Sequence, residues 1–473
     1  MLRAASRLLA VAVVIVVLAG LSLTEARAQT SGDWPSYLYN AARTSYNGGE
    51  KIITPSTARK LTMLWTQTAG SSISTQPIVV NGVIYYGSWD GYERAVDAVS
   101  GTQRWAVFLG VTTDLSCEPP TSMGVASTAA VGTIKVHGKA TRAVFVGGGD
   151  GSFYALNAST GREIWQTRLG APPGYFLWSS PLLYHGSIYE GVASFGDCPL
   201  VRGGMVRMNA ATGAVKSRFY TVPPGCTGAD VWGSATVDPA TGDIYFATGN
   251  GGPCRKRETL GVAVVQTDAS LHLLGSWQVP SAKLPNDDSD FGSTPTLFSA
   301  SINGVVHLLV GLQNKNGIYY AFNRYAISRG PLWQDRMASG GNCPECGTGD
   351  ISPSAYDGRL LFIGTEQTRV GGVLCAGSIR AVRPSTGKVV WADCLQGGPV
   401  LGAVTAVPGV AFVDAGSTVY AVGTNRGTPL WSYKDMNGGS GFWAAGFWGA
   451  PTVSDGRVFV GNQDGNLYAF GID

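Results

Sequence analysis

The chain has few charged residues and no excess of either sign. Asp, Glu, Lys and Arg make up 14% of its 473 residues, and the formal net charge is +3. Without residues 1–28, which carry three arginines and one glutamate, the net charge falls to about +1. A nearly neutral chain has no electrostatic attraction to nucleic acid or to an anionic membrane surface, so neither is expected as a partner.

Several catalytic motifs are also missing. No Cys-x-x-Cys-His sequence is present, which excludes covalent c-type haem, and no Gly-x-Ser-x-Gly sequence indicates a serine hydrolase. The histidines are scattered and give no support to a hydrolase with a histidine-bound metal; they are His137, His185, His272 and His307. Glycine is abundant instead, at 66 residues, which together with the low charge favours many short strands joined by tight turns over helices.

The first 28 residues have the pattern of a secretory signal. Arg3 and Arg7 precede an apolar run over Leu8–Leu23, and Ala26-Arg27-Ala28 has the small-x-small form of a cleavage site. The run is shorter than the ~20 residues that span a bilayer, so a signal is favoured over an uncleaved membrane anchor. We therefore expect cleavage after Ala28, no membrane span in the mature protein, and a periplasmic or extracellular location. Residues 29–473 are expected to form one domain.

All eight cysteines lie beyond the expected signal, where an oxidising compartment and an even count favour disulfides. Among the many possible connectivities we expect local pairs, with the fourth assigned by elimination: Cys226–Cys254, Cys343–Cys346, Cys375–Cys394 and Cys117–Cys198. Cys343-Pro-Glu-Cys346 can also be read as half of a metal knuckle, but no second pair and no suitably spaced histidine follows it. The first cysteine, Cys117, is far from residue 28, so a lipidated N-terminus is not expected.

From Ser74 onward the sequence repeats one unit. Residues 82–105 (GVIYYGSWDGYERAVDAVSGTQRW) and 143–165 (AVFVGGGDGSFYALNASTGREIW) show it clearly: strands separated by Gly turns and ending on an aromatic residue. Eight such closing aromatics can be counted: Trp65, Trp105, Trp165, Phe219, Trp277, Trp333, Trp391 and Trp431. Eight four-stranded units predict an all-β, eight-bladed β-propeller with antiparallel blades.

The two ends of the repeat region complement each other. Leu61–Thr68 reads as an outer strand with no blade before it, and Val458–Gly471 supplies inner strands with no Trp strand after them. Pairing the two would close the ring and leave no open edge. Each closing aromatic is expected to pack between neighbouring blades.

The repeats have the form DGxxYALNAxTGxxxW, and residues 231–250 read VWGSATVDPATGDIYFATGN. With the eight-unit count and the signal, they resemble the pyrroloquinoline quinone (PQQ) dehydrogenases over nearly all of 34–473. The resemblance implies an eight-bladed propeller that holds PQQ and Ca²⁺ on its axis. A single propeller without a fused haem domain is similar in layout to the polyvinyl-alcohol-dehydrogenase-type PQQ-repeat proteins.

Four residues fall on the site motifs of this family. Trp232 (in VWGS) lies where the family places the Trp that stacks on PQQ. Asn250 (in ATGN) matches the calcium-ligand Asn, and Asp290 (in DSDFGSTP) matches the general base, which lies close to the metal. Lys315 (in QNKNG) matches the basic residue that hydrogen-bonds the quinone. The resemblance thus implies Asp290 and Lys315 as catalytic, Trp232, Lys315 and Asn250 as cofactor-binding, and Asn250 and Asp290 as metal-binding.

Each of these residues has a plainer interpretation as a packing or turn residue, and Asp287 and Asp288 compete with Asp290 within one loop. Other site positions depart from the family. Ser74 and Ser194 stand where the family has Glu, Met123 where it has Arg, and Asp350-Ile351 where many relatives have Asn-Trp. Because Ca²⁺ affinity rises with ligand charge, a site without one carboxylate binds the ion more weakly unless another acid substitutes. Asp197 and Glu190 are the candidates for that substitution.

The implied activity is oxidation of a small or polymeric alcohol by PQQ. Electrons would pass to a separate acceptor such as a cytochrome, since no haem motif is present. Two other functions stay open. One is a non-catalytic PQQ-like propeller that serves as an envelope scaffold. The other is a secreted binding module for sugars or peptides that uses the aromatic loop Gly438–Trp448. For this loop we prefer the simpler interpretation that it packs over the axis and caps a cofactor pocket.

Overall fold

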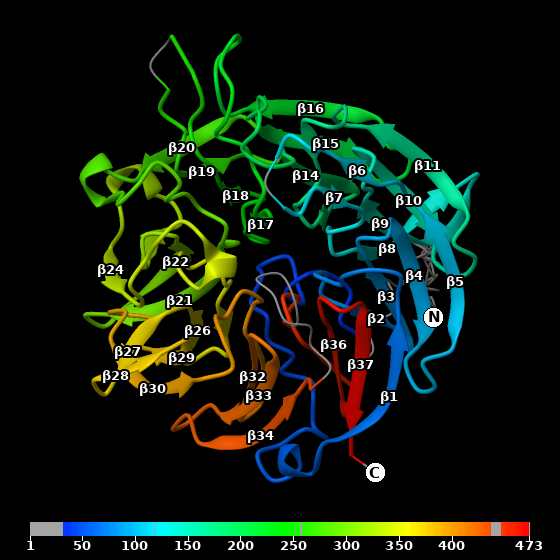
Figure 1. The fold of residues 1–473 in the computed structure, drawn as a ribbon. Coiled ribbons are helices and arrows are strands. Elements are labelled where there is room, and N and C mark those ends of the chain that lie inside the picture. Colours follow the sequence, from blue (N-terminus) through cyan, green and yellow to red (C-terminus); the bar gives the residue numbers. More distant parts are fainter. Residues whose placement is uncertain (1–31, 118, 256–257, 437–445, 473) are drawn as a thin grey trace, which may run out of the picture.

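In the computed structural model, which describes residues 32–117, 119–255, 258–436 and 446–472, eight antiparallel sheets are arranged in a ring (Figure 1). The described residues contain four short 3₁₀ helices and no α-helix. This confirms the predicted all-β, eight-bladed propeller. The expected signal, residues 1–28, lies outside the described residues. Within the described ranges, no helix has the length and apolar character needed to cross a membrane.

The first four blades follow chain order from the innermost to the outermost strand. Blade 1 is β2 (Ile78–Val80), β3 (Val83–Gly87), β4 (Tyr92–Asp97) and β5 (Gln103–Phe108). Blade 2 is β8 (Ala130–Val136), β9 (Lys139–Gly147), β10 (Ser152–Asn157) and β11 (Glu163–Arg168). Blade 3 is β13 (Leu182–Tyr184), β14 (Ser187–Ser194), β15 (Gly204–Asn209) and β16 (Val215–Tyr220), with β12 (Tyr175–Phe176) added to β14. Blade 4 is β17 (Thr236–Val237), β18 (Ile244–Ala247), β19 (Ala263–Thr267) and β20 (Leu273–Gln278).

The last four blades are again given from the innermost to the outermost strand, and in blade 8 the outermost strand is β1, from the start of the chain. Blade 5 is β21 (Thr296–Ile302), β22 (Val305–Asn314), β23 (Ile318–Asn323) and β24 (Trp333–Arg336). Blade 6 is β25 (Ala355–Tyr356), β26 (Leu361–Thr365), β29 (Gly377–Val382) and β30 (Val389–Leu395). Blade 7 is β31 (Thr405–Val407), β32 (Val410–Ala415), β33 (Thr418–Gly423) and β34 (Pro429–Lys434). Blade 8 is β35 (Thr452–Ser454), β36 (Arg457–Gly461), β37 (Asn466–Gly471) and β1 (Thr62–Thr68).

Insertions between these strands form small extra elements. They are the hairpins β6 (Thr112–Thr113) with β7 (Ser122–Met123) and β27 (Thr368–Val370) with β28 (Val373–Cys375), and the 3₁₀ helices η1 (Ala58–Lys60), η2 (Ser281–Lys283), η3 (Ile327–Arg329) and η4 (Pro344–Cys346).

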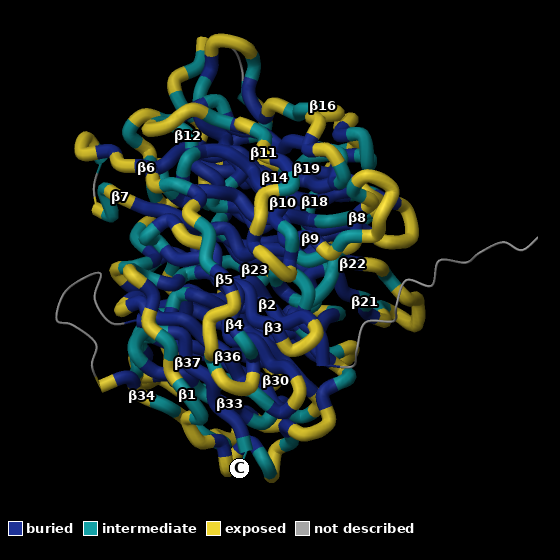
Figure 2. Tube along the Cα trace, turned by 90° about the vertical axis from the view of Figure 1, so that its right-hand side faces the viewer, coloured by how far each residue is buried: buried dark blue, intermediate teal, exposed yellow. Residues whose placement is uncertain are grey.

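The ring closes by pairing the two ends of the chain. β1 lies antiparallel to β37, with Thr66 opposite Tyr468. This is the closure predicted from the sequence, and it leaves blade 8 with a paired outer strand. Figure 2 shows the middle strands of the blades buried and their connecting loops exposed.

The eight closing aromatics all lie on outermost strands, from Trp65 on β1 to Trp431 on β34. Several indole N–H groups donate to a carbonyl of the following blade: Trp105 to Ala158, Trp165 to Ala210, Trp333 to Pro384, Trp391 to Thr424 and Trp431 to Leu61. The repeated Trp therefore joins adjacent blades by a hydrogen bond as well as by its buried ring.

A segment that the repeat did not predict fills the axis of the ring. Residues 34–47 run past the innermost strands and accept backbone hydrogen bonds from several blades in turn. The donors are the N–H groups of Val131, Val237, Leu297, Tyr356 and Ala406, and the acceptors are the carbonyls of Pro35, Ala41, Ala42, Thr44 and Ser45. We call residues 34–47 the axial segment. Because it bonds to successive blades, it ties the ring together from inside.

Arg43 anchors the axial segment. Its guanidinium is fully buried and donates to the carbonyls of Ala235, Tyr37 and Pro181 at 2.9, 2.5 and 3.1 Å. Burial lowers the pKa of Arg43 to about 10, so the group remains charged at neutral pH. The bonds to Ala235 and Pro181 connect the segment to blades 4 and 3, and the bond to Tyr37 lies within the segment itself.

Replacing Arg43 by Met is expected to lower the free energy of unfolding by about 3–5 kcal/mol, since it leaves buried carbonyls without donors. Urea unfolding measures this, with Arg59→Met at an exposed position of η1 as the control. Equal stability of the two variants would show that the axial segment does not stabilise the ring.

The structure contains four disulfides, and they join the pairs named from the sequence: Cys117–Cys198, Cys226–Cys254, Cys343–Cys346 and Cys375–Cys394. In the described part of the chain, one group of three metal-ligating side chains lies within 4.8 Å, namely Cys343, Glu345 and Cys346. Because both of its cysteines are oxidised in one disulfide, the metal-knuckle interpretation is wrong.

Candidate active site

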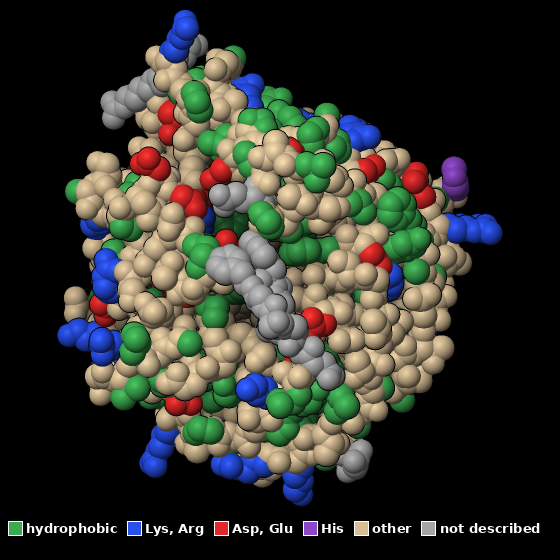
Figure 3. Space-filling view, in the orientation of Figure 1, with side chains coloured by type: hydrophobic (Ala, Val, Ile, Leu, Met, Phe, Trp, Pro, Cys, Tyr) green, Lys and Arg blue, Asp and Glu red, His purple; other side chains and the backbone are tan. Residues whose placement is uncertain are grey.

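Two adjoining cavities lie at one end of the axis. Their volumes are about 360 and 520 Å³, and both are lined by Trp178, Trp232, Asp288, Lys315 and Glu345. Shared walls make them one continuous recess, which we call the axial cavity. Figure 3 shows acidic side chains near the middle of one face of the ring.

The predicted site residues come from the ends of strands in blades 4 and 5. Trp232 precedes β17 and Asp290 precedes β21, while Asn250 follows β18 and Lys315 follows β22. In an antiparallel blade, the start of the innermost strand and the end of its neighbour lie at the same edge. The fold therefore brings together four residues that are separated by up to 83 positions in sequence, from 232 to 315.

Lys315 lies at the centre of a charged contact network. Its Nζ is 2.8 Å from Oδ1 of Asp288 and 2.8 Å from Oδ1 of Asp290. It also lies 5.3 Å from the ring centroid of Trp232, within range of a cation–π interaction. The indole N–H of Trp232 donates to Oδ2 of Asp290 at 2.9 Å, so each oxygen of Asp290 has a contact.

Asn250 is held with its amide nitrogen toward two acids. Nδ2 donates to Oδ1 of Asp288 at 2.7 Å and to Oδ2 of Asp197 at 3.3 Å. Its Oδ1 is buried and has no hydrogen-bond partner in the structure. This oxygen is therefore available to accept a hydrogen bond or to bind a cation. The Cys226–Cys254 disulfide spans the loop that carries Asn250.

Burial and charge set the protonation of these groups. Burial raises the pKa of Asp290, and Lys315 partly offsets this. Burial alone would lower the pKa of Lys315, but the charges of Asp290 and Asp288 outweigh it and raise that pKa, so the amine stays protonated. Burial raises the pKa of Asp197, and the nearby charge of Asp288 adds to the effect.

The residues that depart from the family have structural partners. The hydroxyl of Ser74 accepts from the indole of Trp89 at 2.9 Å, and Met123 packs with Phe176 and Phe195. The hydroxyl of Ser194 accepts from the N–H of Val201 at 3.0 Å. These side chains line the recess or its wall but supply no charge.

Two acids were candidates to replace the Glu that is missing at Ser194, and the structure places only one of them at the cavity. Asp197 lines the axial cavity and contacts Asn250. Glu190 does not line it: this carboxylate is buried inside blade 3, where Arg43 is its nearest influence on charge. The alternative of Glu190 is therefore wrong, because this residue lies four positions before the end of β14 at Ser194, where its side chain is buried inside the blade and does not line the cavity.

Sequence reasoning missed Asp230, a buried carboxylate at the cavity wall two residues before Trp232. It also missed Trp89 and Trp178, which add aromatic surface to the cavity. Trp448 lines the same recess, with its ring centroid 6.1 Å from that of Trp89. Of the aromatic loop Gly438–Trp448, residues 438–445 lie outside the described residues.

Comparisons with known proteins agree with this geometry. A family model described as "Glucose/ethanol/alcohol dehydrogenase, beta-propeller domain" matches residues 34–169, and one described as "Outer membrane protein assembly factor BamB" matches 132–252 and 375–473. A polyvinylalcohol dehydrogenase from Pseudomonas sp. is 24% identical over 468 residues, which cover 86% of this chain and 70% of the relative. Together with the eight-bladed ring, these matches fit a PQQ-dependent alcohol dehydrogenase-like family.

The chain spans less than half the length of several other relatives that it matches. A quinohemoprotein alcohol dehydrogenase from Comamonas testosteroni is 25% identical over 342 residues, which cover 63% of this chain and 46% of the relative. The crystal structure of the quinohemoprotein alcohol dehydrogenase from that organism superimposes with a TM-score of 0.71 at 20% identity, covering 94% of this chain and 81% of the other. This agreement shows that the two proteins share their fold over almost the whole of this chain.

Proposed function

We propose that this protein is a PQQ- and Ca²⁺-dependent dehydrogenase that oxidises an alcohol in the periplasm or outside the cell. A separate acceptor such as a cytochrome would take the electrons. The observation that carries the proposal is the convergence of Trp232, Asp290 and Lys315 on one cavity, with Asn250 bonded to Asp288 in the wall of the same cavity. A propeller used only as a scaffold has no need for a buried Lys between two acids beside an indole face.

The residues present fit a hard cation. The unpartnered Oδ1 of Asn250 and the carboxylate of Asp290 are oxygen ligands of the kind that Ca²⁺ prefers. They also fit a planar quinone. Trp232 and Trp178 offer broad aromatic surface in a recess that includes a volume of about 520 Å³, and Lys315 supplies positive charge beside it.

In the proposed reaction, Trp232 and Lys315 would hold PQQ, which would supply the acceptor for a hydride from the carbinol carbon. Asp290 takes the hydroxyl proton of the substrate, and its buried position, which raises its pKa, makes it a stronger base than an exposed carboxylate. Trp232 and Lys315 fix both oxygens of Asp290, so the base is oriented before the substrate enters. Lys315 remains protonated and balances negative charge near the cavity.

A titration of the metal-free protein with PQQ in the presence of Ca²⁺ tests the proposal. We expect a saturable change in quinone absorbance, followed by reduction of an artificial dye when small alcohols or polyvinyl alcohol are added. Location is checked separately by fractionating cells that express the full chain. Absence of PQQ binding with Ca²⁺ present would refute the dehydrogenase function and favour a non-catalytic propeller, as the partial match to the assembly-factor model allows.

A further inference from the structure

Asp230 is a buried acid on the wall of the axial cavity, and no charged partner neutralises it. Its side chain is 6% exposed and lines the recess together with Ser194 and Asp290. Oδ2 accepts the backbone N–H of Ser194 at 2.8 Å, which fixes the orientation of the carboxylate. Among the described side chains, no cationic group lies within ion-pair distance of Asp230, whereas Lys315 pairs with Asp288 and Asp290.

The second oxygen of Asp230 lies directly against Gly249. A Cβ built on Gly249 would lie 2.2 Å from Oδ1 of Asp230 and 3.2 Å from Oδ2 of Asp290. Any side chain at this position would push Asp230 away and crowd Asp290, so the glycine allows the two carboxylates to approach the same point of the cavity wall.

The unpartnered amide oxygen of Asn250 belongs to the next residue along the chain. The segment that carries it is bonded directly to the segment that carries Asp230: the N–H of Gly249 donates to the carbonyl of Asp230 at 2.8 Å, and the N–H of Ala229 donates to the carbonyl of Asn250. The Cys226–Cys254 disulfide joins the same two segments. The carboxylate and the amide are thereby held in fixed positions relative to each other.

We propose that Asp230 is the carboxylate ligand that replaces the missing Glu at Ser194, and that it binds a hard cation together with Asn250 and Asp290. The inference rests on the proposed function, because it concerns the same metal. The proposed ligand, Asp230, lies 36 positions from Ser194 in sequence. The backbone N–H of Ser194 orients its carboxylate. Ser194 stands where the family has a Glu, so the site lacks one negative charge there. Asp230, at the edge of the neighbouring blade, supplies that charge instead.

Terbium luminescence tests the assignment without any need for turnover. Tb³⁺ is a hard, oxygen-seeking cation, and its emission is sensitised by a nearby indole, which Trp232 supplies through its contact with Asp290. We expect the full-length, metal-free protein to bind Tb³⁺ saturably and to release it to Ca²⁺. Asp230→Asn should weaken both affinities about 10- to 100-fold, as loss of a ligating or orienting group does in metal sites.

The matched control is Asp287→Asn, which removes an exposed acid from the loop that carries Asp290 and should leave both affinities unchanged. Asp230→Asn keeps an oxygen that can accept the N–H of Ser194, and a cooperative thermal transition confirms its fold. Asp230→Ser removes the carboxylate without adding an amide donor and should show the same loss. If both Asp230 variants bind Tb³⁺ and Ca²⁺ with wild-type affinity, the inference is overturned. The proposed function still holds in that case, provided that the wild type oxidises alcohols. Failure of the wild type to bind PQQ would instead refute the proposed function.

Discussion

Replacing Asp290 by Asn is expected to lower kcat for alcohol oxidation by about 10³-fold in protein reconstituted with PQQ and Ca²⁺, the scale at which general-base catalysis contributes. The amide has nearly the shape of the carboxylate and can still accept the indole N–H of Trp232, so the fold should be retained. It cannot take up the proton of the substrate. Steady-state dye reduction at saturating alcohol measures the loss.

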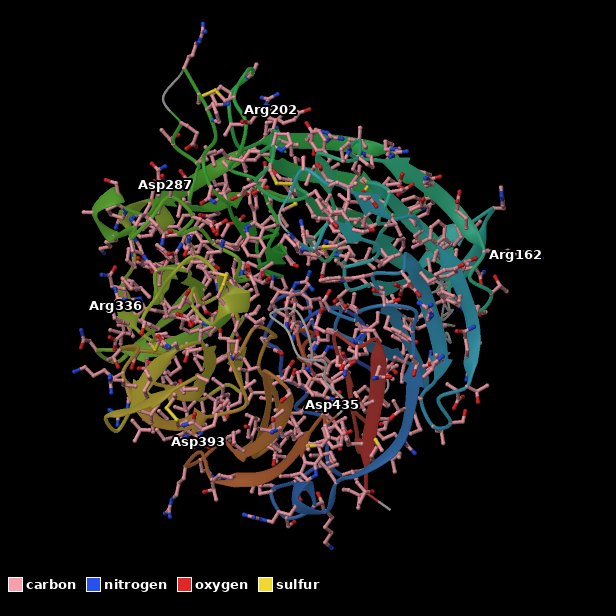
Figure 4. The ribbon with its side chains drawn as sticks, in the orientation of Figure 1. Arg162, Arg202, Asp287, Arg336, Asp393 and Asp435 are labelled. Carbon is pink, nitrogen blue, oxygen red and sulfur yellow. A yellow bond between two sulfur atoms is a disulfide. The ribbon has the colours of Figure 1, made fainter. Side chains whose placement is uncertain are left out.

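The same loop contains two acids that serve as comparisons. Asp287 is exposed and lies toward the rim of the ring in Figure 4, so Asp287→Asn should keep wild-type kcat. Asp288 contacts Lys315 and Asn250 but not Trp232, and Asp288→Asn should reduce activity less than Asp290→Asn does. A larger loss in the Asp288 variant would assign the base to Asp288 and reject Asp290.

The fold could be predicted because its determinants are local and repeated. Each closing aromatic marks one blade, and the unmatched strand Leu61–Thr68 reveals how the ring closes. The axial segment escaped prediction because it has no repeat. Its residues act through backbone carbonyls that bond to several different blades, and no side-chain pattern encodes such contacts.

The candidate site was only partly predictable for a related reason. Trp232, Asn250, Asp290 and Lys315 lie in short motifs at blade edges, so their convergence follows from the fold. Asp230 belongs to no motif that we recognised, and its importance depends on which way its carboxylate points. Its position two residues before Trp232, in the same short segment ahead of β17, is a signal that could have identified it.

The propeller also contains buried acids away from the proposed metal ligands. Glu93, Glu190, Asp350 and Asp414 are fully buried, and oxygens of each have no hydrogen-bond partner. Burial raises the pKa of Asp350 to about 7, from 3.8 in an exposed chain, and raises the pKa values of the other three well above the usual range.

The free energy of unfolding is therefore expected to fall as the pH rises from about 4 to about 7. Over this range the unfolded chain has released the proton of Asp350 while the folded protein still holds it, so each rise in pH favours unfolding. The pKa difference at Asp350 alone corresponds to roughly 4 kcal/mol. The buried glutamates and Asp414 act in the same direction.

Urea unfolding of the metal-free protein across this pH range measures the slope, and Asp350→Asn identifies its source. The amide keeps an acceptor for the N–H of Glu366, a 2.9 Å bond in the wild type, but it has no proton to lose. The variant should therefore be more stable than the wild type above pH 7 and should show a shallower pH dependence, whereas Asp287→Asn should follow the wild type. A stability that rises with pH in the wild type would mean that these carboxylates are ionised in the folded protein, and that cations or water inside the ring compensate their charge.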